Sequence, residues 1–593
     1  MFKLDKYFGK LSFLVLSVAV YGGLTMAGGG CANSSISPTG GAKDTIAPVL
    51  LNMTPAQGSK NFKGKEIVFT FNEYVQLKDQ NKNFVISPPL PEKRPELRLK
   101  GKSVAVRFPV EPADSTTYYL EFGNSVVDLN ESNPAQSLNF IFSTFDEIDS
   151  MMYAGVVVDA FTLAPVEGAS VFLYADNIDS IPYKKNPSAL SKSDKDGAFM
   201  IKGIKNINYK IVALLDANNN FRYDPASERI AFRDSTIKPY WLSAQDSIAL
   251  ADLPLLNMFT ENAKRQALLE YKRLEPRLIQ LVFNSINPQI NKFEINGLTR
   301  ENMIRETSVF GDTVKYWLKP TTLPDSIFAS LIYMKTDSLN MLSPDTTELK
   351  FPVEKKKKES INRKRGRDKD KDKEDEEEEI IPITPNIAAN AARIYENGIH
   401  FGFKTPLLRV DTSKIQLKVF DDTGKEKTPV RFTFERDSAA LRNYRLNTAW
   451  KTAAKYELLL MPEAFVDIYG IANDSIVKSL ETANPEKYGV LKIDVHNAEQ
   501  QYIIQIIKDK KTVVQKIIHG NGVYSFPYLE AGKYGVRVIE DKNANGRWDT
   551  GQYLAHKQPE RVVMMRFADD EDLIAMRASW EIEQTLDIKN IFK

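Results

Sequence analysis

Residues 204–224 read IKNINYKIVALLDANNNFRYD, and residues 529–549 read LEAGKYGVRVIEDKNANGRWD. Each stretch alternates apolar and polar residues around a tyrosine and then passes into a run of Asp, Asn and Arg. The alternation predicts a half-buried strand, and the Asp/Asn run predicts a tight loop. The shared positions, 325 residues apart, include Tyr209, Asp216, Asn218, Asn220, Arg222 and Asp224 in the first stretch. One β-rich module is therefore used twice.

Short alternating stretches also occur outside this repeat. Examples are Ile67–Phe71, Ser103–Phe108, Tyr118–Phe122 and Phe140–Phe142. A looser second repeat relates residues 67–144 to residues 399–480, because both pass from an alternating strand to a tyrosine strand and a Val-Asp turn. The best helix candidate, residues 261–273, covers only about three turns. The pattern predicts an all-β chain of tandem β-sandwiches.

The bulk composition limits the class of protein. At 593 residues the chain is long enough for about four or five domains, and an apolar content of 42% is enough to bury their cores. The formal net charge of +2 shows no basic excess, so nucleic acid is not an expected partner. Cys31 is the only cysteine, which excludes disulfides, zinc fingers and cysteine hydrolases.

The N-terminus has the order of a secretory signal. Lysines precede an apolar run over residues 11–20, and small residues then lead to Cys31. The segment Ala27–Cys31 resembles a bacterial lipobox, although Gly28 stands where most lipoboxes have Leu. The resemblance implies that Cys31 is lipidated and binds the chain to a membrane. Two alternatives are a transmembrane anchor and ordinary cleavage near Gly30 that leaves a free thiol.

Several segments resemble known domain families. Residues 47–144 resemble the bacterial Ig-like domain of the SbsA type, with a Thr54–Gly58 turn, a strand ending in Asn72-Glu73 and a late Asp128 turn. Residues 385–484 look like another copy. Residues 153–174 and 194–213 resemble a carboxypeptidase-regulatory, transthyretin-like sandwich. The whole chain resembles an Ig-like-domain lipoprotein of the Bacteroidota, a family whose described role is mostly structural.

These resemblances and the composition predict a domain order. We expect a signal peptide and lipobox (1–31), a tether (32–46), an SbsA-type Ig-like domain (47–146), a transthyretin/carboxypeptidase-regulatory-like domain (150–258), an Ig-like β-sandwich (264–353), a charged low-complexity linker (354–383), an Ig-like domain (384–484) and a transthyretin-like domain (487–593).

The strongest chemical signal is the repeated Asp/Asn loop. Calcium prefers about six to eight oxygen ligands, and oxygen-bearing side chains at loop positions one, three, five and nine fit a wrapping loop. Position twelve lacks the usual glutamate in both copies, since Ser227 and Gln552 stand there; Glu228 or Glu560 can substitute only if the chain turns back. Any Ca²⁺ affinity should therefore be weak. The alternative is that the same side chains form Asx turns. The candidate ligands are Asp216, Asn218, Asn220, Asp224, Asp541, Asn543, Asn545 and Asp549.

Catalytic motifs are missing from the sequence. The four histidines, His400, His496, His519 and His556, form no metal-binding motif, and no nucleophile elbow, Walker loop or dinucleotide fingerprint occurs. Exposed tryptophans would offer stacking surfaces for sugars, although packing within the domains is the alternative; Trp548, inside the second loop, is the first to test.

A recurring Asp-Ser/Thr-apolar tripeptide resembles the O-glycosylation sequon of exported Bacteroidota proteins. The alternative is turn-then-strand patterning. The candidate residues are Thr45, Ser180, Ser247, Ser326 and Ser475.

Together these features predict a non-enzymatic lipoprotein of the bacterial envelope, expected at the outer membrane. It would act as a structural, adhesive or interaction scaffold with a protein or glycan partner. A glycan-binding surface protein is the alternative, and a hydrolase is a more distant one.

Overall fold

The computed structural model describes residues 45–593 except 226, 242–252, 263–264, 321, 338–340, 353–380, 422, 439 and 568–570. The expected signal peptide, Cys31, most of the tether, Ser247 and most of the charged linker lie outside the described residues. The chain divides into two compact units, one ending at Ile148 and one beginning at Asp149, apart from residues 87–91, which group with the second.

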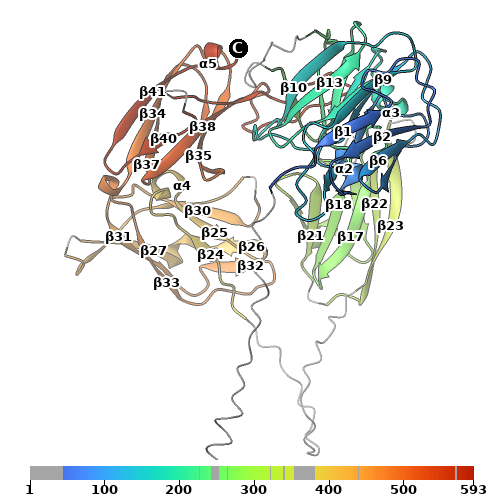
Figure 1. Ribbon diagram of the computed structural model, residues 1–593. Coiled ribbons are helices and arrows are strands. Elements are labelled where there is room, and N and C mark those ends of the chain that lie inside the picture. The colour runs from blue at the N-terminus through green and yellow to red at the C-terminus, as the bar shows by residue number, and fades with distance from the viewer. Residues whose placement is uncertain are drawn as a thin grey trace, which may run out of the picture. The chain divides into compact units, whose positions relative to one another are not determined.

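The described chain is nearly all β, as the sequence predicts (Figure 1). The four alternating stretches quoted above fall on β2, β6, β7 and β9, and inward-facing positions of these strands are buried. Among the residues that the structure describes, helices are confined to single turns. The expected class of tandem β-sandwiches is confirmed.

The first unit contains three small sheets, in the orders β1-β2-β6-β5, β3-β8 and β4-β7-β9. Its core is aromatic: the Phe142 ring lies 4.6 Å from Phe62 and 5.2 Å from Tyr118, measured between centroids. Its elements are β1 (Leu50–Thr54), β2 (Glu66–Phe71), β3 (Val75–Leu77), α2 (Gln80–Asn83), β4 (Val85–Ser87), β5 (Glu96–Lys100), β6 (Ser103–Arg107), β7 (Thr117–Glu121), β8 (Val126–Asp128) and β9 (Asn139–Ser143).

The second unit begins with the module that carries the first Asp/Asn loop, here called the first repeated module (residues 151–261). One sheet has the order β13-β10-β16, with β16 parallel to β10, and the other has the order β12-β11-β14-β15. Its elements are β10 (Met151–Asp159), β11 (Ser170–Tyr174), α3 (Ile181–Lys184), β12 (Ala189–Lys192), β13 (Ala198–Ile204), β14 (Lys210–Leu214), β15 (Ile230–Phe232) and β16 (Leu255–Met258).

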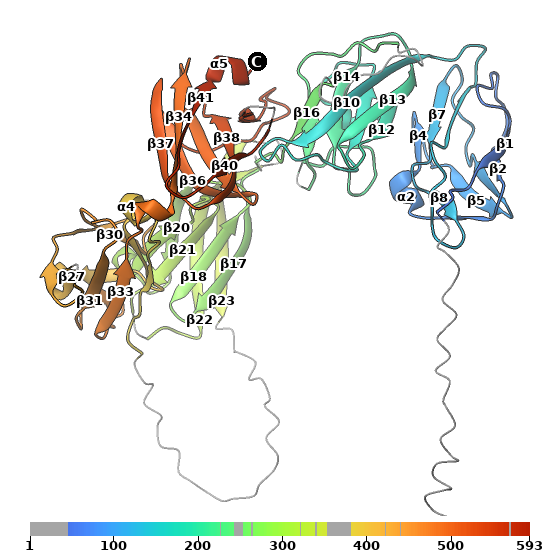
Figure 2. The ribbon, with the colours of Figure 1, turned by 60° about the vertical axis from the view of Figure 1, so that its left-hand side comes forward.

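The last module (residues 489–593) repeats this topology strand for strand. Its sheets are β37-β34-β41, with β41 parallel to β34 (Figure 2), and β36-β35-β38-β39, with β40 added beside β38. The structural repeat is therefore longer than the sequence motif. Its elements are β34 (Gly489–His496), β35 (Tyr502–Lys508), β36 (Lys511–Ile518), β37 (Gly522–Leu529), β38 (Gly532–Glu540), β39 (Val562–Met564), β40 (Ile574–Met576), β41 (Glu581–Asp587) and α5 (Ile588–Ile591).

Residues 386–481 repeat the topology of the first unit. The order β24-β25-β30-β29 corresponds to β1-β2-β6-β5, and β26-β32 corresponds to β3-β8. A third sheet has the order β28-β27-β31-β33. The elements are β24 (Asn386–Ala388), α4 (Ile394–Asn397), β25 (Ile399–Gly402), β26 (Leu407–Val410), η3 (Thr412–Lys414), β27 (Ile415–Phe420), β28 (Lys427–Pro429), β29 (Thr433–Arg436), β30 (Asn443–Asn447), β31 (Lys455–Leu460), β32 (Phe465–Asp467), β33 (Ile476–Glu481) and η4 (Pro485–Lys487).

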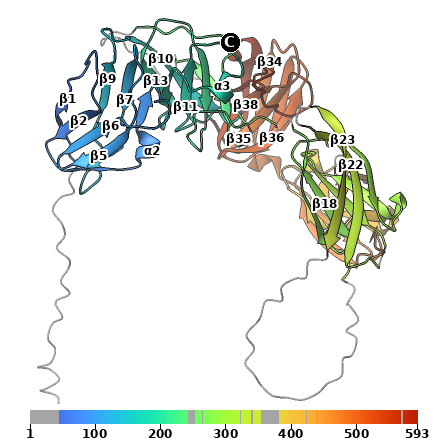
Figure 3. The ribbon, with the colours of Figure 1, turned by 90° about the vertical axis from the view of Figure 1, so that its right-hand side faces the viewer.

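Residues 268–352 form a sandwich of two sheets, β17-β18-β21-β20 and β19-β22-β23. The long strands β22 and β23 lie side by side (Figure 3). The elements are β17 (Leu268–Glu275), β18 (Leu278–Phe283), β19 (Ile290–Ile295), η2 (Arg300–Asn302), β20 (Met303–Thr307), β21 (Thr313–Leu318), β22 (Ser326–Thr336) and β23 (Leu342–Pro352).

The helix predicted over residues 261–273 is wrong. Residues 268–275 form β17, an antiparallel partner of β18. The charged side chains resembled a helical surface, but Arg273 is buried and donates to the carbonyls of Pro276 (2.7 Å) and Pro324 (2.9 Å). Pairing with β18 and these bonds outweigh a weak local helix preference.

A buried aspartate closes the turn after β8. One Asp128 carboxylate oxygen accepts hydrogen bonds from the amides of Asn130, Glu131 and Ser132 at 2.7–3.0 Å, and the other accepts from Asn133. Burial by itself raises the pKa of Asp128, but these bonds outweigh it and hold the pKa below the ordinary value of 3.8. Asp467, after β32, caps the equivalent turn through the amides of Tyr469 and Ile471.

We predict that Asp128 makes the first unit sensitive to acid. A lowered pKa in the folded state means that the stabilisation is present above pH 3.8 and is lost as the pH falls through the folded-state pKa. Asp128→Asn should lower the melting temperature of this unit at pH 7 and flatten its loss between pH 7 and pH 3, measured by calorimetry. The control is Asp114→Asn, an exposed carboxylate of the same unit. An equal acid response in wild type and Asp128→Asn would contradict the assignment.

Candidate functional site

The first Asp/Asn loop connects β14 to β15 and is closed by its own side chains. The Asp216 carboxylate accepts hydrogen bonds from the amides of Asn220 and Phe221, both at 3.1 Å. Asn218 Oδ1 also accepts from the Asn220 amide (2.9 Å). The carboxamide nitrogens of Asn218 and Asn220 donate to Asp224 at 2.9 and 3.1 Å. The four predicted side chains therefore converge.

The second loop, which follows β38, reproduces these bonds. Asp541 accepts from the amides of Asn545 (3.1 Å) and Gly546 (2.8 Å). Asn543 and Asn545 both donate to Asp549 through their carboxamide nitrogens. The same hydrogen-bond scheme, in the same register, explains why the residue types recur.

A buried glutamate joins each loop. Glu228 accepts from the amide of Asp224 (3.0 Å), and Glu560 accepts from the amides of Lys542 and Asp549, both at 2.9 Å. In both modules the chain therefore turns back and brings the glutamate to the loop, which the sequence analysis required if Glu228 or Glu560 is to replace the glutamate missing at position twelve. Burial raises the pKa of both glutamates above the ordinary value.

The loops as described have Asx-turn geometry. Among the described residues no group of three or more His, Cys, Asp or Glu side chains is arranged to hold a metal ion. An ion would have to replace the internal bonds that now hold the Asp and Asn side chains. Calcium binding by these loops stays a prediction.

The connection between Asp549 and Glu560 is longer than its counterpart in the first repeated module, and this insertion docks on that module. We call residues 550–558 the docking arm. Tyr553 of the arm is buried, with 1% of its surface exposed. Its ring packs 5.0 Å from Phe232 and 6.3 Å from Tyr223, and Lys210 Nζ lies 5.5 Å from its centroid.

Polar contacts along the arm reinforce this docking. The Tyr553 amide donates to the Glu261 carboxylate at 2.6 Å, and Glu261 also accepts from the Tyr223 hydroxyl at 2.9 Å. The other contacts are Thr550 Oγ1 to the Thr260 carbonyl (2.6 Å), His556 Nε2 to Asp179 (2.9 Å) and Gln558 Nε2 to the Phe232 carbonyl (3.2 Å).

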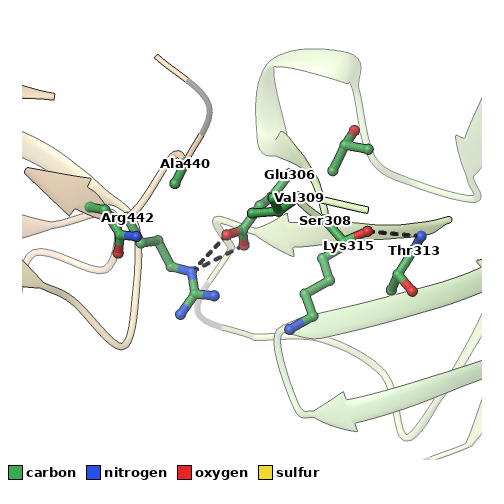
Figure 4. Close-up of a pocket in the computed structure, with 9 residues that line it drawn as sticks. Glu306, Ser308, Val309, Thr313, Lys315, Ala440 and Arg442 are labelled. Atoms are coloured by element: carbon green, nitrogen blue, oxygen red, sulfur yellow. Dashed lines mark hydrogen bonds and ion pairs between the residues drawn. The ribbon is translucent and has the colours of Figure 1, made fainter. Parts of the chain in front are cut away.

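A second contact joins β20 to the start of β30. Glu306 accepts two hydrogen bonds from Arg442 Nε, at 2.9 and 3.1 Å, beside a small cavity of about 230 Å³ (Figure 4). Trp317 Nε1 donates to the same carboxylate at 2.8 Å, and the Arg442 guanidinium lies 5.4 Å from the Trp317 ring. The pair fixes one module against the next.

The remaining candidate residues are scattered. Thr45 and Ser475 are exposed, whereas Ser180 and Ser326 are half-buried. The four histidines are exposed and lie on separate segments. Trp317 is buried, Trp450 and Trp548 are half-buried, and Trp241 and Trp580 are 63% and 44% exposed. Glycosylation of the serine and threonine candidates stays a prediction.

The sequence analysis missed the docking arm as a binding element. Its only signal is the insertion that breaks the register of the repeat after Asp549. The aromatic partners of the Tyr553 ring lie more than 300 residues earlier in the chain, so no local pattern identifies them.

Family models match two parts of the chain. Residues 44–144 match the bacterial Ig-like domain, and residues 482–558 match an uncharacterized protein family conserved in bacteria, DUF2141. The expected Ig-like domain at the start of the described chain is thus confirmed. A search of curated proteins finds no match.

Solved structures with tandem β domains are similar to the chain at 8–9% identity. The four N-terminal Ig domains of Dscam1 isoform 6.9 match 88% of this chain and 98% of that one, with a TM-score of 0.12. The S-layer protein rSbsC(31-844) matches 89% and 59%, with a TM-score of 0.13. The human desmocollin-1 ectodomain matches 91% and 98%, with a TM-score of 0.13. Scores this low carry no argument about arrangement or function.

The helices of the described residues are all too short to cross a membrane.

We predict that Asp541 is needed for the stability of the last module. Asp541 is 1% exposed, and Asp541→Ala leaves the Gly546 amide and the Gln501 carboxamide without their acceptor and removes one of the two acceptors of the Asn545 amide, which should cost about 1–3 kcal/mol in the free energy of unfolding. Chemical denaturation would measure the loss. Glu583→Ala, an exposed carboxylate of the same module, is the control and should stay within about 0.5 kcal/mol of wild type. An unchanged midpoint for Asp541→Ala would refute the role.

Proposed function

We propose that this protein is a non-enzymatic scaffold of the bacterial envelope, held to the membrane by a lipid on Cys31. One observation carries the proposal: sandwich modules with their own apolar cores are fixed to one another by side-chain contacts such as Tyr553 in the first repeated module and Arg442 on Glu306. A chain of closed cores joined in this way suits spacing and binding rather than reaction. Among the described residues, no side-chain arrangement favours the hydrolase alternative.

Lipidation and location are the parts of the proposal that rest on the N-terminal sequence. The basic, apolar and small-residue order before Cys31 is typical of an exported lipoprotein. Together with the Ig-like domain, it supports an outer-membrane lipoprotein of the Bacteroidota type, with a protein or glycan partner at the envelope. The Asp-Ser/Thr sequons are consistent with O-glycosylation of such a protein.

We predict that Cys31→Ala releases the protein from the membrane. Without the thiol there is no acyl acceptor, so the variant should move from the detergent-requiring fraction to the soluble fraction in a bacterium that processes lipoproteins. The measurements are fractionation and intact mass, in which wild type should exceed the polypeptide from Cys31 onward by at least the mass of the lipid. Ser35→Ala, in the same tether, should fractionate like wild type. A soluble, unacylated wild type would overturn the proposal.

We also propose that the two Asp/Asn loops bind Ca²⁺ weakly. In each loop two asparagine side chains donate to one aspartate, whose amide donates to a buried glutamate, so oxygen-bearing side chains of the kind that calcium prefers lie within one loop. Ion binding would then add a small stabilisation to the modules that carry the loops.

We predict that roughly 10 mM calcium stabilises each module that carries a loop by about 1.4–2.7 kcal/mol, for a dissociation constant of about 0.1–1 mM. Burial raises the pKa of Glu228 and Glu560, so protons should begin to displace calcium above the ordinary glutamate range, and the stabilisation should fall as the pH is lowered. The double variant Asp224→Asn/Asp549→Asn, which removes one charge from each loop, should lose the effect. An unchanged melting temperature in millimolar calcium would eliminate these sites.

A glycan-binding protein is the second candidate function. It is favoured by one specific observation, which is that Trp548 lines a recess between the two repeated modules.

A further inference from the structure

A recess of about 630 Å³ lies between the first repeated module and the last module. Phe161 and Arg229 contribute to one wall, and Gln505, Gln515 and Trp548 contribute to the other. This volume lies within the range of about 300–1,000 Å³ that is usual for small-molecule sites. Both apolar and polar side chains face it, as in a site that binds an amphipathic ligand.

The aromatic side chains of the recess are held in fixed positions. Trp548 Nε1 donates to the Glu560 carbonyl at 2.9 Å, which orients the indole ring. Its centroid lies 5.3 Å from Phe161, at an interplanar angle of 53°. The guanidinium of buried Arg537 packs 4.6 Å from the Phe161 centroid, so one face of that ring is already covered. Trp548 packs against Phe161 and the Ile503, Ile539 and Val562 cluster, but it is half-buried and lines the recess, so its ring is the stacking surface that remains.

The polar side chains of the recess are planar and their charges largely cancel. Two basic side chains, Arg229 and Arg547, and two acidic ones, Asp159 and Glu261, line the recess, and Arg229 is ion-paired with Asp159. Gln505 Nε2 donates to Gln515 Oε1 at 2.8 Å, and Gln515 is exposed. Carboxamide and guanidinium groups present neighbouring hydrogen-bonding atoms in one plane, which suits adjacent hydroxyl groups of a ligand. A compensated set of charges favours a neutral ligand.

We infer that this recess binds a neutral saccharide, with the apolar face of one pyranose ring on Trp548 and its hydroxyl groups bonded to Gln515 and Arg229. Indole rings provide the flat apolar area, and the planar polar groups fix orientation. The inference rests on the second candidate function above and adds to it the place and the ligand class.

The docking arm should control this site from a distance. The two walls belong to modules that are far apart in the sequence, and Tyr553 is buried between those modules without lining the recess. Only the docked state brings both walls together, so the apparent affinity depends on the fraction of docked chains. Loss of the arm contact should therefore weaken binding although no ligand contact is removed.

The experiment uses the full mature chain on an array of neutral and acidic oligosaccharides, followed by calorimetric titration with the best neutral binder. Trp548→Ala and Tyr553→Ala should each weaken binding at least tenfold, and Gln515→Ala several-fold. Trp580→Ala removes an exposed tryptophan elsewhere in the last module and should leave the affinity unchanged. Because Gln515 is exposed, its variant tests the site even if Trp548→Ala fails to fold.

Each other outcome has one meaning. If no glycan binds, both the site and the glycan-binding function are wrong. If a glycan binds wild type, Trp548→Ala and Gln515→Ala equally, the function stands but the recess is not its site. If only acidic glycans bind and the recess variants abolish that binding, the ligand class is wrong.

Discussion

The burial of Tyr553 in the first repeated module is the contact on which the arrangement of the last module depends. Residues 223, 232 and 553 meet around one tyrosine ring, and Glu261 accepts hydrogen bonds from both sides of the contact. A fully buried aromatic side chain removes a large apolar area from water, and Glu261 pairs the Tyr223 hydroxyl and the Tyr553 amide, whereas the Tyr553 hydroxyl makes no hydrogen bond to the described residues. Contacts of this kind join sandwich modules that each keep their own apolar core.

Carboxylates close several turns of the described chain, and three of them, Asp128, Asp467 and Asp541, are buried. Asp128 collects amides at the end of a strand of the first unit, Asp467 does so at the equivalent place within residues 386–481, and Asp216 and Asp541 do the same in the repeated modules. A carboxylate accepts several amides at once, so it satisfies backbone donors that a tight turn leaves without partners. The sandwich modules contain no cysteine, so disulfides cannot fix their loops. These hydrogen-bonded turns fix the loop conformation instead.

Much of the fold can be predicted from the local alternation of apolar and polar residues, whereas elements specified by distant partners cannot. The period of two along Ile67–Phe71 and Tyr118–Phe122 identifies strands because one face of each is buried. The repeat over Asp216 and Asp541 identifies equivalent loops because their hydrogen bonds are made within the loop. Residues 268–273 were misassigned because the strand is specified by its partner β18 and by the burial of Arg273, which no local pattern reveals.

The candidate recess could not be predicted from the sequence for the same reason. Trp548 was singled out by its place in the second loop, but Phe161, Arg229 and Gln515 carry no motif. They meet because two modules pack together, through the docking arm and through Phe161 on the last module. A tertiary property of this kind depends on residues more than 300 positions apart, and only the insertion after Asp549 marked it.

The two Asp/Asn loops, compared with each other, show how the last module holds the docking arm without a change in the loop itself. In the first repeated module Glu228 lies four residues after Asp224, whereas in the last module Glu560 lies eleven residues after Asp549, yet both glutamates accept the aspartate amide at nearly the same distance. Glu560 also donates its own amide to the Asp549 carbonyl at 3.0 Å, so the base of the arm is closed on both sides. The entropic cost of a longer loop rises only slowly with its length once its ends are held. Because its base is closed, the insertion does not disturb the sandwich of the last module. The tip of the insertion, which includes Tyr553, can therefore contact another module.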